Sequence, residues 1–335
     1  MVNAVEAKLS MKSAIPARVL GTLLLLVSSP AVLAMAVGDD VSHGAGTAVA
    51  PGGTPTISSR SSARHVVTRA RRLRTGIDQP ALRSSTALVV DETSASVVYS
   101  KNADVVTPIA SITKLMTALV VLEANQPLNE KIEITRDDQN LVKPNVSRLV
   151  PGTELSRGDL LHLALMSSEN RAANALGRNY PGGLGACVAA MNAKARSLGM
   201  TTAHFAEPTG LSSDNVASPD DLAKLVIAAS QNTAIQTYST DSRYMVPVGR
   251  HMLEYRNTDS LVSNPSWNII VQKTGYIAEA GKCLVMKAII EGRAVVIVLL
   301  DSVGKQSRVA DARRIKKWME GRLSAETQRL TARRA

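Results

Sequence analysis

The segment Pro108-Ile109-Ala110-Ser111-Ile112-Thr113-Lys114 opens an apolar run that ends near Leu122. Proline disfavours the α conformation at the residue before it, so the run predicts a helix that begins after Pro108. Because this helix is apolar on nearly every side, the pattern indicates a central, buried helix. Ser111 and Lys114 lie three residues apart and therefore share one helix face. A neutral lysine at that spacing can accept the proton of the serine hydroxyl and make the serine a nucleophile.

Two later motifs can complete a site around this pair. Ser168-Glu169-Asn170 falls at a break between two predicted helices, and Lys273-Thr274-Gly275 falls at the end of a predicted strand. Ser168 can relay a proton to a leaving amine, and Asn170 can hydrogen-bond both Lys114 and a substrate amide. Lys114 acts as a base only if burial and a nearby positive charge lower its pKa, and Lys273 is the candidate for that charge.

The Lys273-Thr274-Gly275 motif predicts a binding site for a substrate carboxylate. An ammonium and a hydroxyl can both donate hydrogen bonds to a carboxylate, while Gly275 lets a ligand approach the strand closely. The backbone N–H groups of Ser111 and Tyr276 are the candidates for an oxyanion hole. Together these residues predict a serine acyl-transfer site that needs no histidine, metal ion or cofactor.

Two of these motifs have a second copy in the chain. Ser302-Val303-Gly304-Lys305 repeats the Ser-x-x-Lys spacing where a strand turns into the last helix, and a capping or solvent role suffices for it. Ser213-Asp214-Asn215 repeats Ser-x-Asn in a polar stretch, where turn formation explains these residue types. The copy at Ser111 is preferred because the two other motifs accompany it and its helix is apolar, and the copy at Ser168 because it lies at a helix break whereas a turn explains Ser213.

The predicted elements place strands at both ends of one domain and helices between them. Two Val-rich runs at 86–90 and 96–100 predict a hairpin. Further strands are predicted at 244–248, 268–272, 283–290 and 294–300, and helices at 157–166, 172–179, 184–198, 219–230 and from 303 or 304 to 321. This order predicts an α+β fold, in which one antiparallel sheet is flanked by helices and carries an all-helical subdomain.

Composition and charge exclude some classes of function. The chain has 335 residues, of which 45% are hydrophobic and 3% aromatic, so it can bury a large aliphatic core. Its formal charge of +11 is uneven, because residues 84–320 hold 25 Lys and Arg against 23 Asp and Glu, while the two ends hold 14 against five. The nearly neutral central part does not favour nucleic-acid binding, and no zinc-finger or RNA-recognition signature is present.

The two ends of the chain predict export and flexible attachment. Residues 1–36 have the outline of a secretory signal peptide, with basic residues, an apolar centre and small residues around Ala34 and Ala36. The alternative is a membrane anchor, because the uncharged run is just long enough to span a bilayer. Residues 37–83 predict a disordered linker, first rich in Gly, Pro and Ser and then in Arg, which acts as a spacer or as a tether to an anionic surface. The catalytic domain is predicted at 84–321, followed by a basic tail at 322–335.

The three motifs in this order resemble those of penicillin-binding proteins and class A β-lactamases. From about residue 86 to residue 318, the chain resembles the serine-type D-Ala-D-Ala peptidases of the low-molecular-mass penicillin-binding proteins. Residues 108–119, 166–180 and 272–281 most resemble the D-alanyl-D-alanine endopeptidases of the penicillin-binding protein 7 type. The resemblance implies a β-lactamase/transpeptidase-like fold, a periplasmic peptidoglycan substrate, an acyl-enzyme and covalent inhibition by β-lactam antibiotics. It also suggests enzymes of cell-wall synthesis or hydrolysis as partners.

Three other functions remain open at this point. A D-Ala-D-Ala carboxypeptidase is the nearest, because a terminal D-Ala and a cross-linking diaminopimelate both place a carboxylate beside the scissile nitrogen. The family's carboxypeptidases usually carry an extra C-terminal β-domain, and no elements for one are predicted after Gly321, which favours the endopeptidase. A β-lactamase needs a deacylating base, and the residues after Glu207 depart from the expected Leu and Asn. An inactive peptidoglycan-binding module is disfavoured by the intact motifs.

The cysteines and histidines predict no further chemistry. Cys187 and Cys283 permit a disulfide in an oxidising compartment, but both occur in apolar surroundings and two buried thiols fit equally well. The five histidines lack metal-ligand spacing, so packing or surface roles are expected for them.

Overall fold

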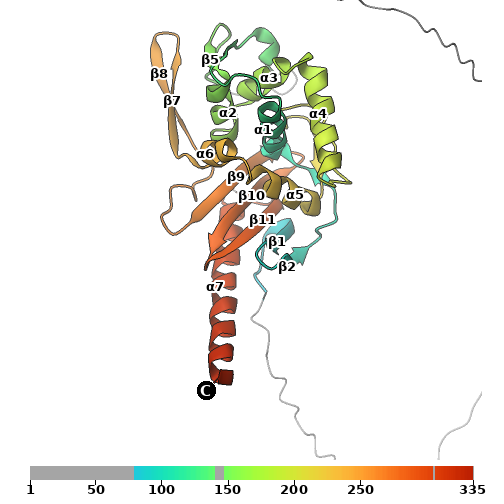
Figure 1. The fold of residues 1–335 in the computed structure, drawn as a ribbon, viewed down its shortest axis with the longest axis vertical. Helices are drawn as coiled ribbons and strands as arrows, with labels where there is room; N and C mark the ends of the chain where they lie inside the picture. Colours follow the sequence, from blue (N-terminus) through green and yellow to red (C-terminus); the bar gives the residue numbers. More distant parts are fainter. Residues whose placement is uncertain (1–78, 140–146, 305, 335) are drawn as a thin grey trace, which may run out of the picture. The chain divides into compact units, whose positions relative to one another are not determined.

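A five-stranded sheet is the centre of the computed structural model, which describes residues 79–139, 147–304 and 306–334 (Figure 1). The strand order is β2-β1-β11-β10-β9, and every neighbouring pair is antiparallel. The strands are β1 (Ser84–Asp91), β2 (Ser96–Lys101), β9 (Asn268–Ile277), β10 (Gly281–Ile290) and β11 (Arg293–Ser302). This sheet confirms the predicted α+β fold, in which the first and last strands of the domain pair.

Within the described residues, the helices α1–α6 all lie between β2 and β9 in the sequence. They are α1 (Thr113–Glu123), α2 (Arg157–Met166), α3 (Asn170–Arg178), α4 (Gly183–Ser197), α5 (Pro219–Ala229) and α6 (Thr233–Thr240). Two short 3₁₀ helices, η1 (Ala110–Ile112) and η2 (Arg136–Asp138), accompany them. The bounds predicted for α2 are confirmed because Ser156 and Asp159 form a capping box at its first turn.

Three helices differ from the prediction. The helix expected to begin after Pro108 and to carry Ser111 begins as α1 only at Thr113, and Ser111 lies in the 3₁₀ helix η1 before it. The short helix α6 was not predicted, because its Thr, Tyr and Ser residues have weak helix propensity and the helix packs on β9. The last helix, α7 (Ser307–Arg334), begins later than predicted and continues past Gly321. The segment 322–334, predicted as a tail, is therefore helical.

The predicted strand at 244–248 belongs to a separate hairpin and not to the central sheet. Strand β7 (Arg243–Val248) pairs with β8 (His251–Arg256), which the sequence did not predict (Figure 1). Two further small sheets join β3 (Thr107–Pro108) to β6 (Val216–Ala217), and β4 (Lys131–Glu133) to β5 (Glu154–Ser156). The pairing of β3 with β6 brings residue 216 beside Pro108, directly before the Ser111 segment.

The central sheet separates two hydrophobic clusters. Val296 and Val298 of β11 pack in the cluster that includes the residues of α1 to α5. Ile297, between them in the sequence, packs with Ile315 and Trp318 of α7 on the other face. Side chains alternate between the two faces of a strand, so one strand supplies both clusters. The Ser111 segment therefore lies on the face opposite α7, inside the larger cluster.

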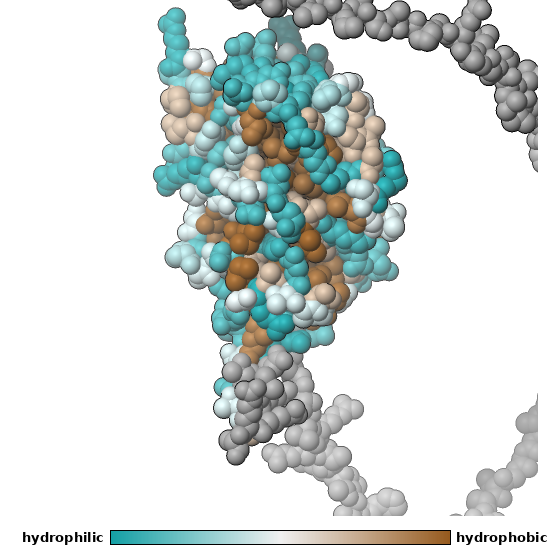
Figure 2. Space-filling view, viewed as in Figure 1, coloured by the Kyte–Doolittle hydropathy of each residue, from teal (hydrophilic) through white to brown (hydrophobic). Residues whose placement is uncertain are grey.

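The remaining features of the fold are the surface, the chain ends and the two cysteines. Figure 2 shows hydrophilic residues over much of the face in view, with hydrophobic residues in smaller areas between them. In the described part of the chain, no helix has the length and apolar character needed to cross a bilayer. The predicted signal segment 1–36 and most of the predicted linker lie outside the described residues. Cys187 and Cys283 are both buried free thiols, so no disulfide joins them.

Candidate active site

Ser111 lies in the 3₁₀ turn that precedes α1, and two glycines approach this turn closely. A Cβ on Gly275 would lie 3.0 Å from Ile109 O and 3.2 Å from Ser111 N. A Cβ on Gly210, where φ is +81°, would lie 2.0 Å from Ala110 O. A Cβ at Gly210 would overlap this backbone and one at Gly275 would crowd it, so the 207–215 loop and strand β9 both pack closely against the Ser111 turn.

The side chain of Lys114 is fully buried and contacts three acceptors. Its Nζ lies 2.9 Å from Ser111 Oγ, 2.6 Å from Asn170 Oδ1 and 2.5 Å from the carbonyl oxygen of Thr209. Burial lowers the pKa of Lys114 to about 7, although the carboxylates of Glu207 and Glu169 oppose this shift. A substantial fraction of the amine is therefore neutral near pH 7, and it is within reach of the serine hydroxyl.

Lys273 contributes to the electrostatics of the site. The sequence predicted that burial and the charge of Lys273 together lower the pKa of Lys114, and burial of Lys114 is the main cause of that shift. The pKa of Lys273 is itself lowered, first by burial and then by the charges of Lys114 and Arg308, while Asp259 opposes the shift. The Asp259 carboxylate is almost fully buried beside these cations, where it favours the protonated form of Lys273.

The residues of the Ser-x-Asn motif connect the two lysines. Ser168 lies between α2 and α3 with φ +62°, and its Oγ accepts a hydrogen bond from Lys273 Nζ at 2.9 Å. Asn170 begins α3 and contacts Lys114, as predicted from the sequence. The structure thus brings together Ser111, Lys114, Ser168, Asn170 and Lys273, residues that are up to 162 positions apart in the sequence.

The Lys273-Thr274-Gly275 motif lies on β9, which is the outermost strand of the described central sheet. Thr274 Oγ1 lies 2.5 Å from Thr258 Oγ1, and Arg308 of α7 donates a hydrogen bond of 2.8 Å to the carbonyl oxygen of Gly275. Tyr276 follows the motif on β9 and is 60% exposed, and its backbone N–H remains the candidate for the predicted oxyanion hole. An outer strand can add an extended peptide through its unpaired backbone groups.

The second copies of the motifs have structural roles. Ser302 is buried at the end of β11, where its Oγ lies 2.6 Å from Ser84 Oγ, and Lys305 lies outside the described residues. Asn215 Oδ1 accepts hydrogen bonds from the backbone of Ala206 and Glu207, so it fixes the loop that contains Gly210. These contacts agree with the preference for Ser111 and Ser168.

Glu207 also fixes this loop. Its carboxylate accepts hydrogen bonds from the backbone N–H groups of Thr209, Gly210 and Ser212. Sequence reasoning missed Thr209, Gly210, Asp259 and Arg308 as neighbours of the site. No motif or spacing marks them, because each reaches the site through contacts between distant segments.

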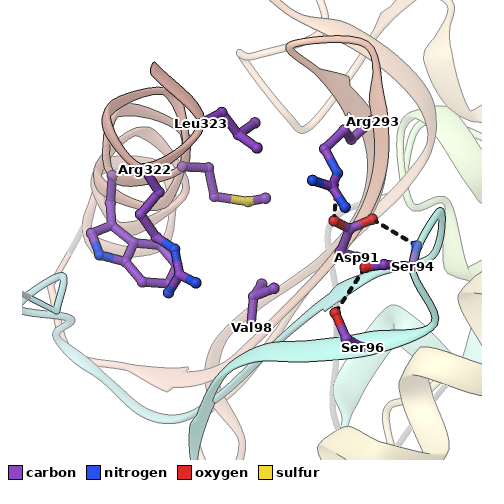
Figure 3. Close-up of a pocket in the computed structure, with 9 residues that line it drawn as sticks. Asp91, Ser94, Ser96, Val98, Arg293, Arg322 and Leu323 are labelled. Carbon is purple, nitrogen blue, oxygen red and sulfur yellow. Dashed lines mark hydrogen bonds and ion pairs between the residues drawn. The ribbon is translucent and has the colours of Figure 1, made fainter. Parts of the chain in front are cut away.

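Other features of the described residues lie apart from this site. One pocket has a volume of about 180 Å³, and its lining residues include Val98 and Arg322. Figure 3 shows that Arg293 and Ser94 both contact Asp91 in this pocket. None of its lining residues belongs to the three motifs. The described residues contain no group of three or more His, Cys, Asp or Glu side chains that could hold a metal ion.

Comparison with known proteins finds a matching family, similar proteins and a similar solved structure. The sequence profile of a peptidase family described as D-alanyl-D-alanine carboxypeptidase matches residues 74–304. The D-alanyl-D-alanine endopeptidase of Pseudomonas aeruginosa is 47% identical over 245 residues, which cover 72% of this chain and 79% of the relative. That of Escherichia coli is 46% identical over 248 residues, covering 73% and 80%. The crystal structure of the Streptomyces K15 DD-transpeptidase superposes with a TM-score of 0.67 at 27% identity, over 72% of this chain and 98% of that one.

Proposed function

Because the chain belongs to the D-alanyl-D-alanine carboxypeptidase family of peptidases, we propose that it is a serine endopeptidase that cleaves D-alanyl-diaminopimelate cross-links in peptidoglycan. The relatives named D-alanyl-D-alanine endopeptidase support this choice within the family. The observation that carries the proposal is the 2.9 Å contact between Lys114 Nζ and Ser111 Oγ, with the lysine pKa lowered to about 7 by burial.

In the first half of the reaction, Ser111 Oγ attacks the carbonyl carbon of D-alanine. Neutral Lys114 accepts the hydroxyl proton, and the backbone N–H groups of Ser111 and Tyr276 stabilise the oxyanion. The C–N bond then breaks, and the leaving amine takes a proton that passes from Lys114 through Ser168. The products of this half are an ester on Ser111 and a free amine.

In the second half, a water molecule attacks the carbonyl carbon of the ester. Its proton passes to Lys114, the ester C–O bond breaks, and Ser111 Oγ recovers a proton. Asn170 hydrogen-bonds Lys114 in both halves and so keeps its amine directed at Ser111 Oγ. No cofactor or metal ion takes part in these steps.

Lys273 and Thr274 form the binding site, here called the carboxylate seat, for the substrate carboxylate next to the scissile nitrogen. Gly275 lets the substrate approach β9. A penicillin carries a carboxylate at the equivalent distance from its reactive amide, so β-lactam antibiotics are expected to acylate Ser111 and inhibit the enzyme. The same seat accepts the terminal D-alanine of a pentapeptide, which makes a D-Ala-D-Ala carboxypeptidase the second candidate. Relatives named D-alanyl-D-alanine carboxypeptidase support that alternative.

The place of action follows from the substrate. We assign residues 1–36 to export into the periplasm, as a signal peptide or an anchor, and 37–83 to a linker before the catalytic domain. Enzymes that build or hydrolyse the cell wall are the expected partners. A β-lactamase is disfavoured because the Glu207 carboxylate is engaged by backbone N–H groups of its own loop.

Purified cross-linked muropeptide dimers and pentapeptide monomers separate the two candidate activities. We expect the dimers to be converted to monomers, which chromatography and mass spectrometry detect. Release of D-alanine from the pentapeptide, with the dimers left intact, would instead assign the chain to the carboxypeptidases.

The Ser-x-x-Lys copies provide a matched pair of variants for the nucleophile. Ser111→Ala is expected to abolish covalent labelling by fluorescent penicillin, because it removes the attacking oxygen. Ser302→Ala has the same chemical change in the other copy and is expected to retain labelling. Labelling of the Ser111→Ala protein would contradict the assignment of the nucleophile.

A further inference from the structure

A second pocket lies next to the Ser-x-Asn motif and is not used by the mechanism. Its volume is about 400 Å³, and it is lined by Arg148, Ser167, Glu169, Glu254, Tyr255 and Arg256. Ser167 and Glu169 flank Ser168 directly in the sequence. Two residues that line the pocket are therefore direct neighbours in sequence of a candidate active-site residue.

A second segment that lines this pocket, at the end of strand β8, also leads to residues that contact the site. Tyr255 and Arg256 end strand β8, and the chain reaches Thr258 two residues later. Thr258 N donates a hydrogen bond to the carbonyl oxygen of Met166, and Thr258 Oγ1 lies 2.5 Å from Thr274 Oγ1. A peptide bound along β9 would thus have this pocket beside it.

The pocket presents charges of both signs in an ordered arrangement. The guanidinium of Arg148 lies 4.0 Å over the Tyr255 ring and donates a hydrogen bond to the Glu254 carbonyl oxygen. The Glu254 carboxylate accepts a hydrogen bond of 2.6 Å from Arg256 Nε. Each guanidinium has five N–H groups, so these contacts leave donors for a ligand carboxylate. The carboxylates of Glu169 and Glu254 can accept hydrogen bonds from a ligand ammonium.

The pocket is separate from the carboxylate seat, since Lys273, Thr274 and Arg308 are not among its lining residues. In a D-alanyl-diaminopimelate cross-link, the diaminopimelate on the leaving side has used its distal amino group in the scissile bond. The diaminopimelate of the acyl-side stem keeps both its distal amino group and its distal carboxylate. Only the acyl-side residue therefore offers a zwitterionic head group.

We propose that this pocket binds the zwitterionic end of the diaminopimelate side chain in the acyl-side stem peptide. Arg148 and Arg256 bind its carboxylate, and Glu169 and Glu254 bind its ammonium. The pocket then selects diaminopimelate over lysine at this position, because lysine has the ammonium but lacks the carboxylate. This inference rests on the proposed function and extends it to the choice of stem peptide.

Two cross-linked dimers that differ only in the third residue of the acyl-side stem test this selection. The wild-type kcat/KM is expected to favour diaminopimelate over lysine by about tenfold, which is the effect of one charge-assisted contact. In Arg148→Gln and Arg256→Gln, this ratio is expected to fall toward one, mainly through KM. Arg250→Gln removes an arginine outside the pocket, in the turn at the other end of the β7–β8 hairpin from Arg256, and is expected to keep the ratio.

A binding measurement separates failure of this inference from failure of the proposed function. The Ser111→Ala protein is titrated calorimetrically with the free tetrapeptide containing diaminopimelate or lysine, which requires no cleavage. Tighter binding of the diaminopimelate peptide, lost in Arg148→Gln, supports the pocket even if cross-links are not cut. Equal affinity for the two peptides, or an equal ratio in the wild type and both pocket variants, would overturn it.

Discussion

Lys114 is the residue whose environment has the clearest effect on the reaction. Burial lowers its pKa to about 7, so the amine is mostly protonated at pH 5 and mostly neutral at pH 9. Only the neutral amine can accept the Ser111 proton. The rate constant for acylation by benzylpenicillin is therefore expected to rise about tenfold per pH unit below 7 and to level off above it. Deprotonation of Lys273, whose pKa burial also lowers, is expected to weaken binding of the penicillin carboxylate.

A Lys114→Arg variant is the control for this pH profile. A guanidinium stays protonated throughout the accessible pH range, so it cannot act as the base. We expect its acylation to be lost at every pH between 5 and 9. A wild-type rate that stays constant between pH 5 and 8 would contradict the role of Lys114.

At the scale of single elements, the loop from Glu207 to Asn215 determines where the Ser111 turn lies. Gly210 and Gly152 have similar left-handed φ values of +81° and +86°, but their surroundings differ. At Gly152 a Cβ would meet nothing within 4 Å, whereas at Gly210 it would overlap the Ala110 carbonyl. Replacing Gly152 by another residue therefore introduces only backbone strain, whereas replacing Gly210 introduces the same strain together with a steric overlap.

We predict different outcomes when each glycine is replaced by alanine. Gly152→Ala is expected to lower the free energy of unfolding by about 1–2 kcal/mol, the cost of left-handed φ, and to keep normal penicillin acylation. Gly210→Ala is expected to slow acylation about 100-fold as well, because the Ser111 turn must move away from the new Cβ. Urea unfolding and stopped-flow acylation measure the two effects. Equal acylation rates in the two variants would show that the loop does not fix the serine.

Sequence patterns predicted the elements with strong local signals and missed those with weak ones. The capping box at Ser156 and the N-cap at Ser218 fixed the starts of α2 and α5, because capping is a contact within one turn. Strand β8 was missed because its local signal is weak and its backbone is paired only through contacts with β7. The sequence places the end of the last helix at Gly321, whereas α7 continues to Arg334, because glycine inside a helix costs only about 1 kcal/mol.

For the whole molecule, the central sheet separates the α7 cluster from the larger cluster that contains the Ser111 segment. Apart from Arg308, which contacts Gly275, the buried residues of α7 can therefore be changed without direct contact with the site. Trp318 of α7 is 7% exposed and packs edge-on against Tyr99, with ring centroids 6.1 Å apart. Its removal leaves a cavity on the face away from Ser111.

Trp318→Ala is expected to reduce the free energy of unfolding by about 3–5 kcal/mol, as for other large-to-small changes at buried aromatic residues. Val97→Ala is the control, because the Val97 side chain is 58% exposed and a change of no more than about 0.5 kcal/mol is expected. Urea unfolding gives both values. At low temperature, where both variants are folded, penicillin acylation is expected to be normal. Loss of acylation in folded Trp318→Ala protein would contradict the division by the sheet.

The sequence by itself determined the α+β class, most of the elements and the order of the three motifs. It could do so because helix periodicity, capping and motif spacing are local properties of the chain. The tertiary structure alone decided how Lys114 is desolvated, that the Thr209 carbonyl is its third contact, and that Lys273 contacts Ser168. These features depend on packing between segments far apart in the sequence. The pKa of a buried amine is set by that packing, and no local pattern encodes it.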